Sequence, residues 1–421
     1  KLIGVFGTNE GLPNDPDGFF LPPPKPRLNE LKYIEGARKS NVAVYPSRMS
    51  MVTKKINDDS GVCFYCGQCS RACSVYADFS SGTRLIFPAQ KHGGQIDLFT
   101  NCMVREVTTN QEGKATGVSY INKEDRKEYT LKAKVVVLAA SACSSARILL
   151  NSKSAQHPNG LGNSSDIVGR YLHDSTGSSR SAFIPSLINR KTYNEDGVGG
   201  LHVYSPWWLD NKKLDFPRGY HIEVGGGLGM PSYGFGFNPN EFNKFFGLKV
   251  GGYGNGLRDD VKKYYGSVVG MAGRGESIAQ HDNYCEIDPT TVDEFGIPVL
   301  RFHYNWTEHE VNQAKHMQET FAELIHNMGG EPLGDAPGKD RDYGLAAPGR
   351  IIHEVGTTRM GDNPKISVVN KFQQLHDADN VFIVDAGPFV SQADKNPTWT
   401  ILALSWRTSD YIIEQLKQQN I

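Results

Sequence analysis

Two short apolar runs, far apart in the sequence, most constrain what this chain can fold into. Residues 135–140 read Val-Val-Val-Leu-Ala-Ala, and residues 381–384 read Val-Phe-Ile-Val. Continuous apolar runs of this length are typical of strands that are buried on both faces of a parallel sheet. A small-residue turn and a helical stretch follow the first run, and a helix over 398–416 follows the second. We therefore predict that residues 76–165 and 346–421 belong to one α/β sheet of the Rossmann-like, nucleotide-binding type.

The chain between these two segments has a different pattern. Residues 166–345 contain short alternating stretches separated by Gly- and Pro-rich turns, which predicts an antiparallel sheet. A helix is expected to begin at a Thr307–Glu310 capping box, and an apolar stripe follows it as far as Met328. The predicted fold class is α/β plus α+β, with a substrate-binding domain over 166–345 inserted into a nucleotide-binding domain. Residues 1–75 are expected to be irregular and to lie on the substrate side.

The composition excludes some classes of function. The chain has 45 Lys and Arg against 46 Asp and Glu, a net charge of −1, which argues against a nucleic-acid-binding surface. No apolar run approaches the roughly 20 residues needed to span a bilayer, so no transmembrane helix is expected.

Four of the seven cysteines fall in one short segment, residues 63–73. Cys63, Cys66, Cys69 and Cys73 have the spacing C-x₂-C-x₂-C-x₃-C of a bacterial ferredoxin run, although Ser74 stands where proline is usual. The spacing is compatible with an iron–sulfur cluster, with a zinc ion or with metal-free thiols. The other three cysteines are isolated and are expected to be small buried side chains.

Three blocks near the C-terminus carry a family resemblance. They are His-Glu-Val-Gly-Thr-Thr-Arg-Met-Gly from residue 353, Val-Phe-Ile-Val-Asp-Ala-Gly from residue 381, and Asn-Pro-Thr-Trp-Thr-Ile-Leu-Ala-Leu from residue 396. In order and spacing they resemble the glucose–methanol–choline (GMC) oxidoreductases, a family of flavoenzymes. A weaker similarity covers residues 76–172. The closest likeness is to the large subunits of FAD-dependent sugar and gluconate dehydrogenases.

The resemblance implies a cofactor, FAD, and particular site residues. His353 would be the base that takes the hydroxyl proton of an alcohol, a role that suits an imidazole near neutral pH. Asn396 would be its partner and would hold the substrate oxygen by hydrogen bonding. Flavin contacts are implied at the end of one strand, where Asp385, Ala386 and Gly387 lie. They are also implied at the start of the next helix, at Pro397 and Thr398, and at Val104 of an earlier strand.

Some sugar dehydrogenases of this family carry an iron–sulfur cluster near the flavin and pass electrons to a cytochrome. The resemblance therefore implies a sugar or sugar acid as substrate, a cytochrome or small subunit as redox partner, and a periplasmic or membrane-associated location. No Gly-x-Gly-x-x-Gly phosphate loop occurs in the sequence. We accordingly expect an N-terminally incomplete portion of such a dehydrogenase. Two other interpretations stay open: a non-catalytic protein that cannot hold FAD, and an oxidase that uses oxygen.

Overall fold

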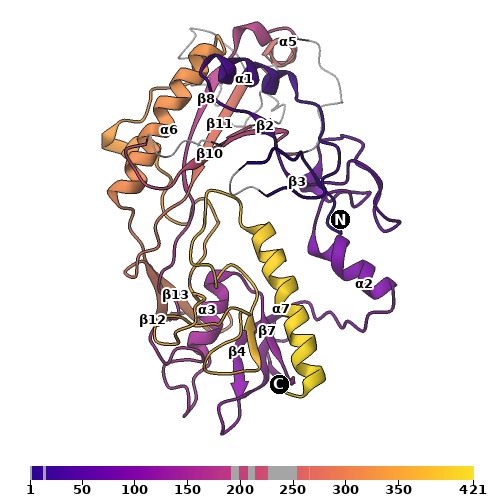
Figure 1. Ribbon diagram of the computed structural model, residues 1–421, viewed down its shortest axis with the longest axis vertical. Coiled ribbons are helices and arrows are strands. Elements are labelled where there is room, and N and C mark those ends of the chain that lie inside the picture. The colour runs from indigo at the N-terminus through magenta and orange to yellow at the C-terminus, as the bar shows by residue number, and fades with distance from the viewer. Residues whose placement is uncertain (1, 13–15, 191–198, 207–213, 226–253, 265) are drawn as a thin grey trace. The chain divides into compact units, whose positions relative to one another are not determined.

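The computed structural model places the chain in two compact units, each assembled from three segments (Figure 1). The structure describes residues 2–12, 16–190, 199–206, 214–225, 254–264 and 266–421. Unit 1 comprises Lys1–Asp97, Gly177–Arg274 and His309–Leu345. Unit 2 comprises Leu98–Thr176, Gly275–Glu308 and Ala346–Ile421. The assignment of separate segments to substrate and flavin stays a prediction.

Unit 1 is built on a six-stranded sheet with the order β14-β8-β11-β10-β9-β2. The β14–β8, β10–β9 and β9–β2 pairs are antiparallel, which confirms the predicted antiparallel sheet. Its strands are β2 (Tyr45–Pro46), β8 (Thr176–Phe183), β9 (Val203–Pro206), β10 (Tyr220–Val224), β11 (Val268–Gly275) and β14 (Glu331–Pro332).

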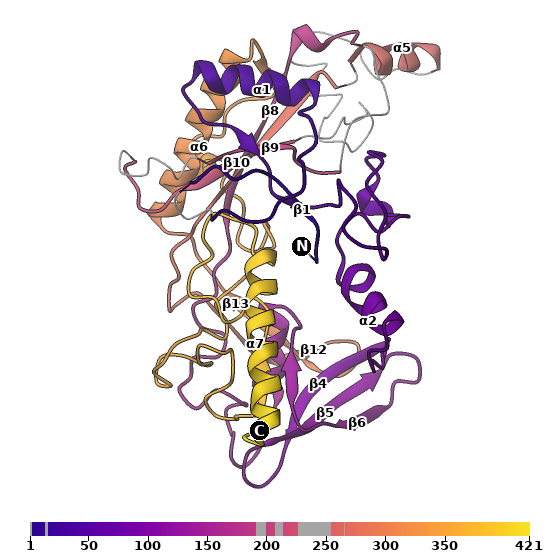
Figure 2. The same ribbon diagram turned by 45° about the vertical axis from the view of Figure 1, so that its right-hand side comes forward.

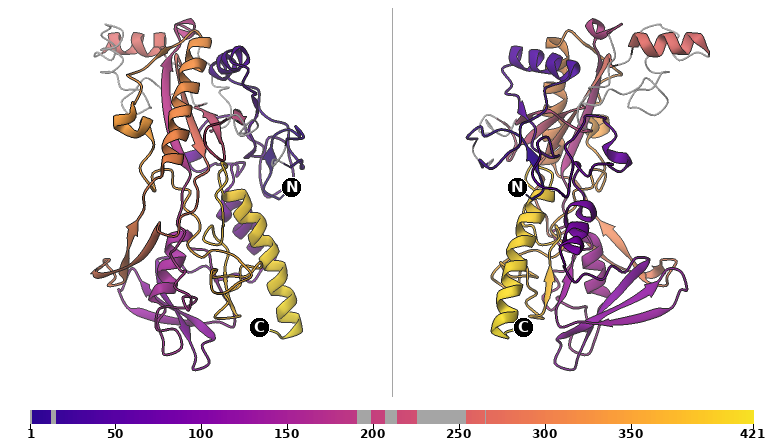
Figure 3. Two further views of the ribbon diagram at one scale, coloured as in Figure 1. Left: turned by 60° about the vertical axis from the view of Figure 1, so that its left-hand side comes forward. Right: turned by 90° about the vertical axis from the view of Figure 1, so that its right-hand side faces the viewer.

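The long helix α6 (Glu308–Asn327) covers this sheet, as Figure 3 shows. Met317, Phe321 and Leu324 on its apolar stripe are fully buried. They share one hydrophobic core with Ile222 and Val269 of the sheet. Burying each such side chain contributes roughly 1.5–3 kcal/mol, so the stripe holds the helix on the sheet. The predicted helix and its buried face are confirmed.

The remaining elements of unit 1 are short, apart from two helices. Helix α1 packs closely on the end of α6, because a Cβ added at Gly36 would lie 2.5 Å from Met328 Cγ. The N-terminal segment is mostly irregular, as predicted, around a small core that contains Phe6 and Met51. The elements are β1 (Val5–Phe6), α1 (Leu28–Lys39), β3 (Met49–Ser50), η1 (Cys69–Arg71), η2 (Gly82–Ile86), α2 (Phe87–Lys91), η3 (Pro185–Leu187), α5 (Asn255–Tyr264) and η5 (Lys339–Gly344).

Unit 2 contains the two apolar runs as a parallel pair of strands, β7 (Val136–Leu138) and β15 (Val381–Ile383). Val381 lies opposite Val136, and the pairing across more than 240 residues confirms the predicted common sheet. Burial on both faces is not seen, because Val137 is 47% exposed while Val136 and Leu138 are buried. Within the described residues, side chains cover only one face of β7.

Helices and antiparallel strands complete unit 2 (Figure 2). Helix α3 (Ala142–Asn151) follows β7 directly, and α7 (Thr398–Gln418) is the predicted last helix. The first strand of unit 2 begins at Cys102. The antiparallel elements are β4 (Cys102–Thr109), β5 (Ala115–Asn122), β6 (Glu128–Lys132) and the hairpin β12 (Tyr284–Val292) with β13 (Pro298–His303). Among the described helices of both units, none is long and apolar enough to cross a membrane.

Candidate active site and cysteine cavity

The segment that carries His353 is held beside residues 173–175 of the same unit. The backbones of His173 and Val355 form an antiparallel bridge with two hydrogen bonds, of 3.1 and 2.9 Å. The bridge fixes how the two segments lie along each other, so the residues next to it meet in a set order. His353 itself is half-buried.

Asp174 anchors the His353 backbone from within the protein. Its Oδ1 accepts the backbone N–H of His353 at 2.9 Å and that of Ser175 at 2.7 Å. The residue is fully buried, and among the described residues its Oδ2 has no hydrogen-bond partner. Burial raises the pKa of Asp174 to about 6. The carboxyl group therefore positions the His353 main chain.

The imidazole of His353 contacts a buried hydroxyl. Ser175 Oγ lies 3.3 Å from His353 Nδ1. Gln392, which is also buried, donates from Nε2 to Ser175 Oγ at 3.2 Å and to the carbonyl oxygen of Lys395 at 3.2 Å. Asn396, the next residue, is exposed. The structure thus connects the chain immediately before Asn396 to the surroundings of His353 through Gln392.

Asp385 joins the carboxyl ends of the two parallel strands. Ser145 Oγ, on α3 after β7, donates to Asp385 Oδ2 at 2.5 Å, and the Gly387 N–H donates to Oδ1 at 2.8 Å. Burial raises the pKa of the Asp385 carboxyl, and the bonds from Ser145 and Gly387 oppose that rise. Carboxyl ends of α/β strands are where nucleotide cofactors bind, so Asp385 lies where the fold places such a ligand.

Gly387 leaves room for a close approach at this edge of the sheet. A Cβ added there would lie 2.3 Å from Thr358 Oγ1 and 3.0 Å from Asp385 Oδ1. Thr358 Oγ1 is buried and, among the described residues, has no hydrogen-bond partner. Ala386, between the two site residues, is buried. The missing side chain of Gly387 therefore lets Thr358 approach its backbone closely.

Pro397 and Thr398 form the start of α7. Pro397 is buried and makes no side-chain cap bond, while Thr398 and Thr400 are exposed. The first N–H groups of a helix have no partner within it, and the positive end of the helix dipole favours an anion. Contact of the strand-end residues and of the start of α7 with a flavin nucleotide stays a prediction.

Val104 has ordinary surroundings. It lies on β4 opposite Tyr120 and packs, partly buried, against the main core of unit 2. Contact with the adenine of a flavin stays a prediction for this residue.

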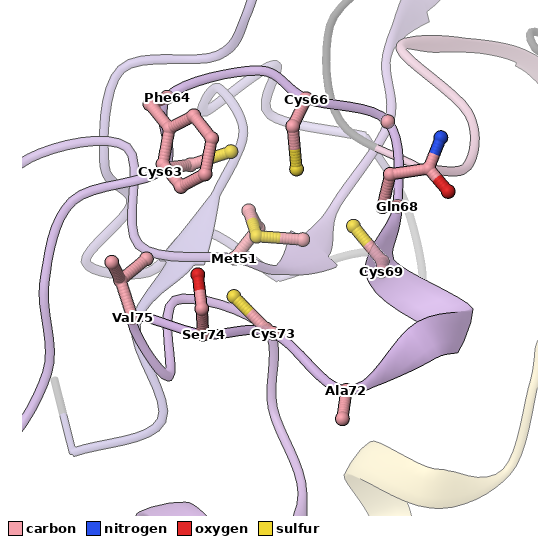
Figure 4. A pocket seen from close by; sticks show the side chains of 11 residues that line it. Met51, Cys63, Phe64, Cys66, Gln68, Cys69, Ala72, Cys73, Ser74 and Val75 are labelled. Atoms are coloured by element: carbon pink, nitrogen blue, oxygen red, sulfur yellow. The ribbon is translucent and has the colours of Figure 1, made fainter.

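The four clustered cysteines of unit 1 line one cavity, and their side chains point into it (Figure 4). The cavity has a volume of about 80 Å³. Tyr65 N donates to Cys63 Sγ at 3.4 Å, and Gly199 N donates to Cys69 Sγ at 3.2 Å. Burial raises the pKa of both thiols. Within the described residues, no group of three or more Cys, His, Asp or Glu side chains is placed to hold a metal ion.

Three residues of the candidate active site were not singled out from the sequence: Asp174, Ser175 and Gln392. Asp174 and Ser175 follow within three residues of the end of segment 76–172, which carries the weaker similarity, and Gln392 lies four residues before Asn396. Proximity to those blocks was the only signal available. None of the three has a local pattern that marks it as functional.

Comparison with known proteins defines the family. Models of the GMC oxidoreductases match residues 41–176 and 280–405, and the chain belongs to this family. The fold agrees: a variant formate oxidase from Aspergillus oryzae superimposes with a TM-score of 0.64 at 11% identity, over 92% of this chain and 70% of that chain. The mixed α/β fold with antiparallel sheets, predicted from the sequence, agrees with this family.

Several curated relatives are similar over much of the chain. A 2-methyl-1,2-propanediol dehydrogenase from Mycolicibacterium austroafricanum is 29% identical over 75% of this chain and 54% of its own length. The gluconate 2-dehydrogenase flavoprotein of Pantoea cypripedii is 26% identical over 99% of this chain and 67% of its own length. The fructose dehydrogenase large subunit of Gluconobacter japonicus is 25% identical over 84% and 60%. The chain thus spans between about half and two thirds of each relative.

Proposed function

We propose that the protein is part of an FAD-dependent oxidoreductase that oxidises a CH–OH group of a sugar or sugar acid. The observation that carries the proposal is the double anchoring of His353. Its backbone is held by Asp174 and its imidazole by Ser175, inside the region that matches the family. A general base needs a fixed position within reach of the proton it removes, and such a base contributes roughly 10²–10⁴ in rate.

The chemistry assigned to this chain's residues is proton removal and orientation. His353 takes the proton when the O–H bond of the substrate breaks, and Asn396 hydrogen-bonds the same oxygen through its side chain. FAD, when bound, accepts the hydride that leaves the carbon, so that the alcohol becomes a carbonyl compound. Asp385, Gly387 and the start of α7 would hold the flavin nucleotide. Thr358 Oγ1 beside Gly387, which is buried and has no hydrogen-bond partner among the described residues, supports this placement.

The substrate class rests on the relatives. Two of them are named for gluconate and fructose and a third for a small diol, and each name describes a dehydrogenase. A polyhydroxylated substrate is therefore the best-supported choice. A cytochrome or another acceptor would receive the electrons.

We propose further that the cysteine cavity takes an iron–sulfur cluster, which would pass single electrons onward. The volume of about 80 Å³ exceeds what one ion or one water molecule needs. The four thiols of the C-x₂-C-x₂-C-x₃-C segment line it. Two of them accept hydrogen bonds from backbone N–H groups, which is typical of cluster ligands. The proposal favours a multi-atom cluster over a single zinc ion on this volume, and it requires the four thiols to move together, since the described residues form no metal-binding group. Iron and acid-labile sulfide measured after anaerobic purification test the idea, and finding neither rejects it.

Substitution of the proposed base tests the main proposal. In the flavin-loaded protein, His353→Ala should lower kcat by roughly 10²–10⁴ while the flavin absorbance stays unchanged. A matched control is His157→Ala, because His157 is a buried histidine of the same unit whose ring, among the described residues, bonds the backbone oxygen of Gly113. Near-normal turnover of His353→Ala would refute the role of this residue.

Two measurements separate the proposal from its alternatives. A non-catalytic protein would purify without the flavin absorption bands, even after incubation with FAD. An oxidase would be reoxidised rapidly by oxygen in a stopped-flow experiment. A dehydrogenase would react slowly with oxygen and rapidly with an artificial one-electron acceptor.

A further inference from the structure

Gln392 makes two hydrogen bonds whose direction is determined by chemistry. Its amide nitrogen lies 3.2 Å from the backbone oxygen of Lys395 and 3.2 Å from Ser175 Oγ. A carbonyl oxygen can only accept, so the bond to Lys395 identifies the donor as the amide nitrogen. That nitrogen has two hydrogens, and each of the two oxygens receives one. Ser175 Oγ is therefore an acceptor towards Gln392.

The remaining capacity of Ser175 limits what it can do for His353. A hydroxyl oxygen has two lone pairs and one hydrogen, and Gln392 uses one lone pair. If the neutral imidazole carries its hydrogen on Nδ1, that N–H donates to the second lone pair and Nε2 keeps its own lone pair. If the hydrogen is on Nε2, Ser175 must donate to Nδ1, and Nε2 cannot accept a proton. Only the first arrangement is compatible with a base that acts through Nε2.

We propose that Ser175 and Gln392 are positioning residues: they hold His353 with its hydrogen on Nδ1, and Gln392 also holds the chain beside Asn396. The inference rests on the proposed role of His353 as base. The Nδ1–H bond to Ser175 is the same in the neutral and the protonated imidazole. Neither side chain has to move when His353 takes a proton, which is the advantage of a prearranged site.

Gln392 gives the arrangement a second consequence. One arm of its amide reaches His353 through Ser175, and the other reaches Lys395, the residue before Asn396. The bond to Ser175 is buried and joins residues 217 apart in sequence, and the bond to Lys395 is part-buried and joins residues 3 apart. Loss of Gln392 should therefore disturb both members of the proposed pair, whereas loss of the Ser175 hydroxyl should disturb only His353.

The test combines two variants with two matched controls. Ser175→Ala removes the acceptor of the Nδ1–H bond, and Gln392→Met removes both donors at similar volume. Ser152→Ala and Gln374→Met are the controls: Ser152 bonds Val107 and Ile148, and Gln374 Nε2 donates to the backbone of Asp379. These control residues belong to unit 2 but not to the proposed site.

The first readout is independent of turnover. Long-range proton–nitrogen NMR spectra of the ¹⁵N-histidine-labelled, flavin-loaded protein report which ring nitrogen carries hydrogen. The His353 signal is identified by its loss in His353→Gln. We expect hydrogen on Nδ1 in the unchanged protein and a shift towards Nε2 in Ser175→Ala, with no shift in Ser152→Ala. Hydrogen on Nε2 in the unchanged protein would overturn the inference.

The second readout is the split between kcat and KM. Misplacing a catalytic group costs roughly 10- to 100-fold, so Ser175→Ala should lower kcat by that factor and leave KM within about 2-fold. Gln392→Met should lower kcat and also raise KM, because Asn396 loses its support. Gln374→Met should change neither. If kcat is unchanged in both Ser175→Ala and Gln392→Met, the positioning role is refuted, even if His353→Ala is inactive. If His353→Ala is active, the proposed base is refuted, and the NMR result alone decides whether Nδ1 donates to Ser175.

Discussion

Asp174 is expected to make stability depend on pH in a direction opposite to most carboxylates. Burial raises the pKa of this side chain from 3.8 to about 6 in the folded protein. The difference corresponds to about 3 kcal/mol, since each tenfold change in proton affinity is worth about 1.4 kcal/mol. The protonated form is the one the fold favours. Its contribution is fully present below pH 3.8 and is lost as the pH rises through about 6.

Asp174→Asn removes this titration and leaves an acceptor oxygen for the two backbone N–H groups. The substitution lowers the free energy of unfolding by an approximately constant amount at all pH values. Its amide N–H₂ is buried in place of Oδ2, which has no hydrogen-bond partner among the described residues. The pH-dependent part is separate from that cost. We expect the free energy of unfolding of Asp174→Asn minus that of the unchanged protein to rise by about 2.5 kcal/mol between pH 4 and pH 7.

Urea unfolding followed by tryptophan fluorescence at several pH values measures this difference. Asp288→Asn is the control, because hydrogen bonds from Thr290 and Thr291 lower the pKa of Asp288 to about 2. Its ionised form stabilises the fold, and that contribution is lost only as the pH falls towards 2. The control difference should therefore be flat between pH 4 and pH 7. A flat difference for Asp174→Asn as well would refute the reasoning.

Two further predictions concern how tightly side chains pack inside each unit. Gly387→Ala should destabilise the protein by roughly 1–3 kcal/mol and weaken flavin retention, because the new Cβ would lie 2.3 Å from Thr358 Oγ1. Thermal unfolding and the flavin-to-protein absorbance ratio measure these effects. The control is Gly256→Ala, whose new Cβ would have no neighbouring atom within 4 Å, and an effect of Gly387→Ala no larger than that of the control would contradict the prediction. In metal-free protein, iodoacetamide should modify the exposed Cys66 before Cys285, whose pKa burial raises to about 12. Mass spectrometry after timed labelling decides the second point, and early labelling of Cys285 would show that its surroundings are more open than the structure has them.

Much of the secondary structure could be predicted from local patterns. The stripe that includes Met317, Phe321 and Leu324 predicted both α6 and its buried face, because the 3.6-residue period reports burial directly. The two apolar runs likewise predicted a parallel pair, and β7 and β15 form it. The extent of burial was less well predicted: Val137 has the composition of a core residue but is 47% exposed. A run of valines shows that a strand forms and does not show what covers each face.

The candidate site divides in a similar way between sequence and structure. The residue blocks at 353, 381 and 396 pointed to the family, and through it to His353, Asn396 and the flavin contacts. The side chains around His353 could not be read in this way. Ser175 is 178 residues from His353 and 217 from Gln392. No local sequence pattern predicts that a single serine or glutamine will make a buried polar contact.

The sequence by itself therefore determined which segments form strands and helices and which family the chain resembles. Only the tertiary structure decided which polar groups meet. The antiparallel bridge between His173 and Val355 lays two distant segments together, and this register brings Asp174 to the backbone of His353 and Ser175 to its ring. The physical reason is that apolar burial depends on the local period of the chain. A hydrogen bond depends on two atoms coming within about 3 Å, which the path of the whole chain controls.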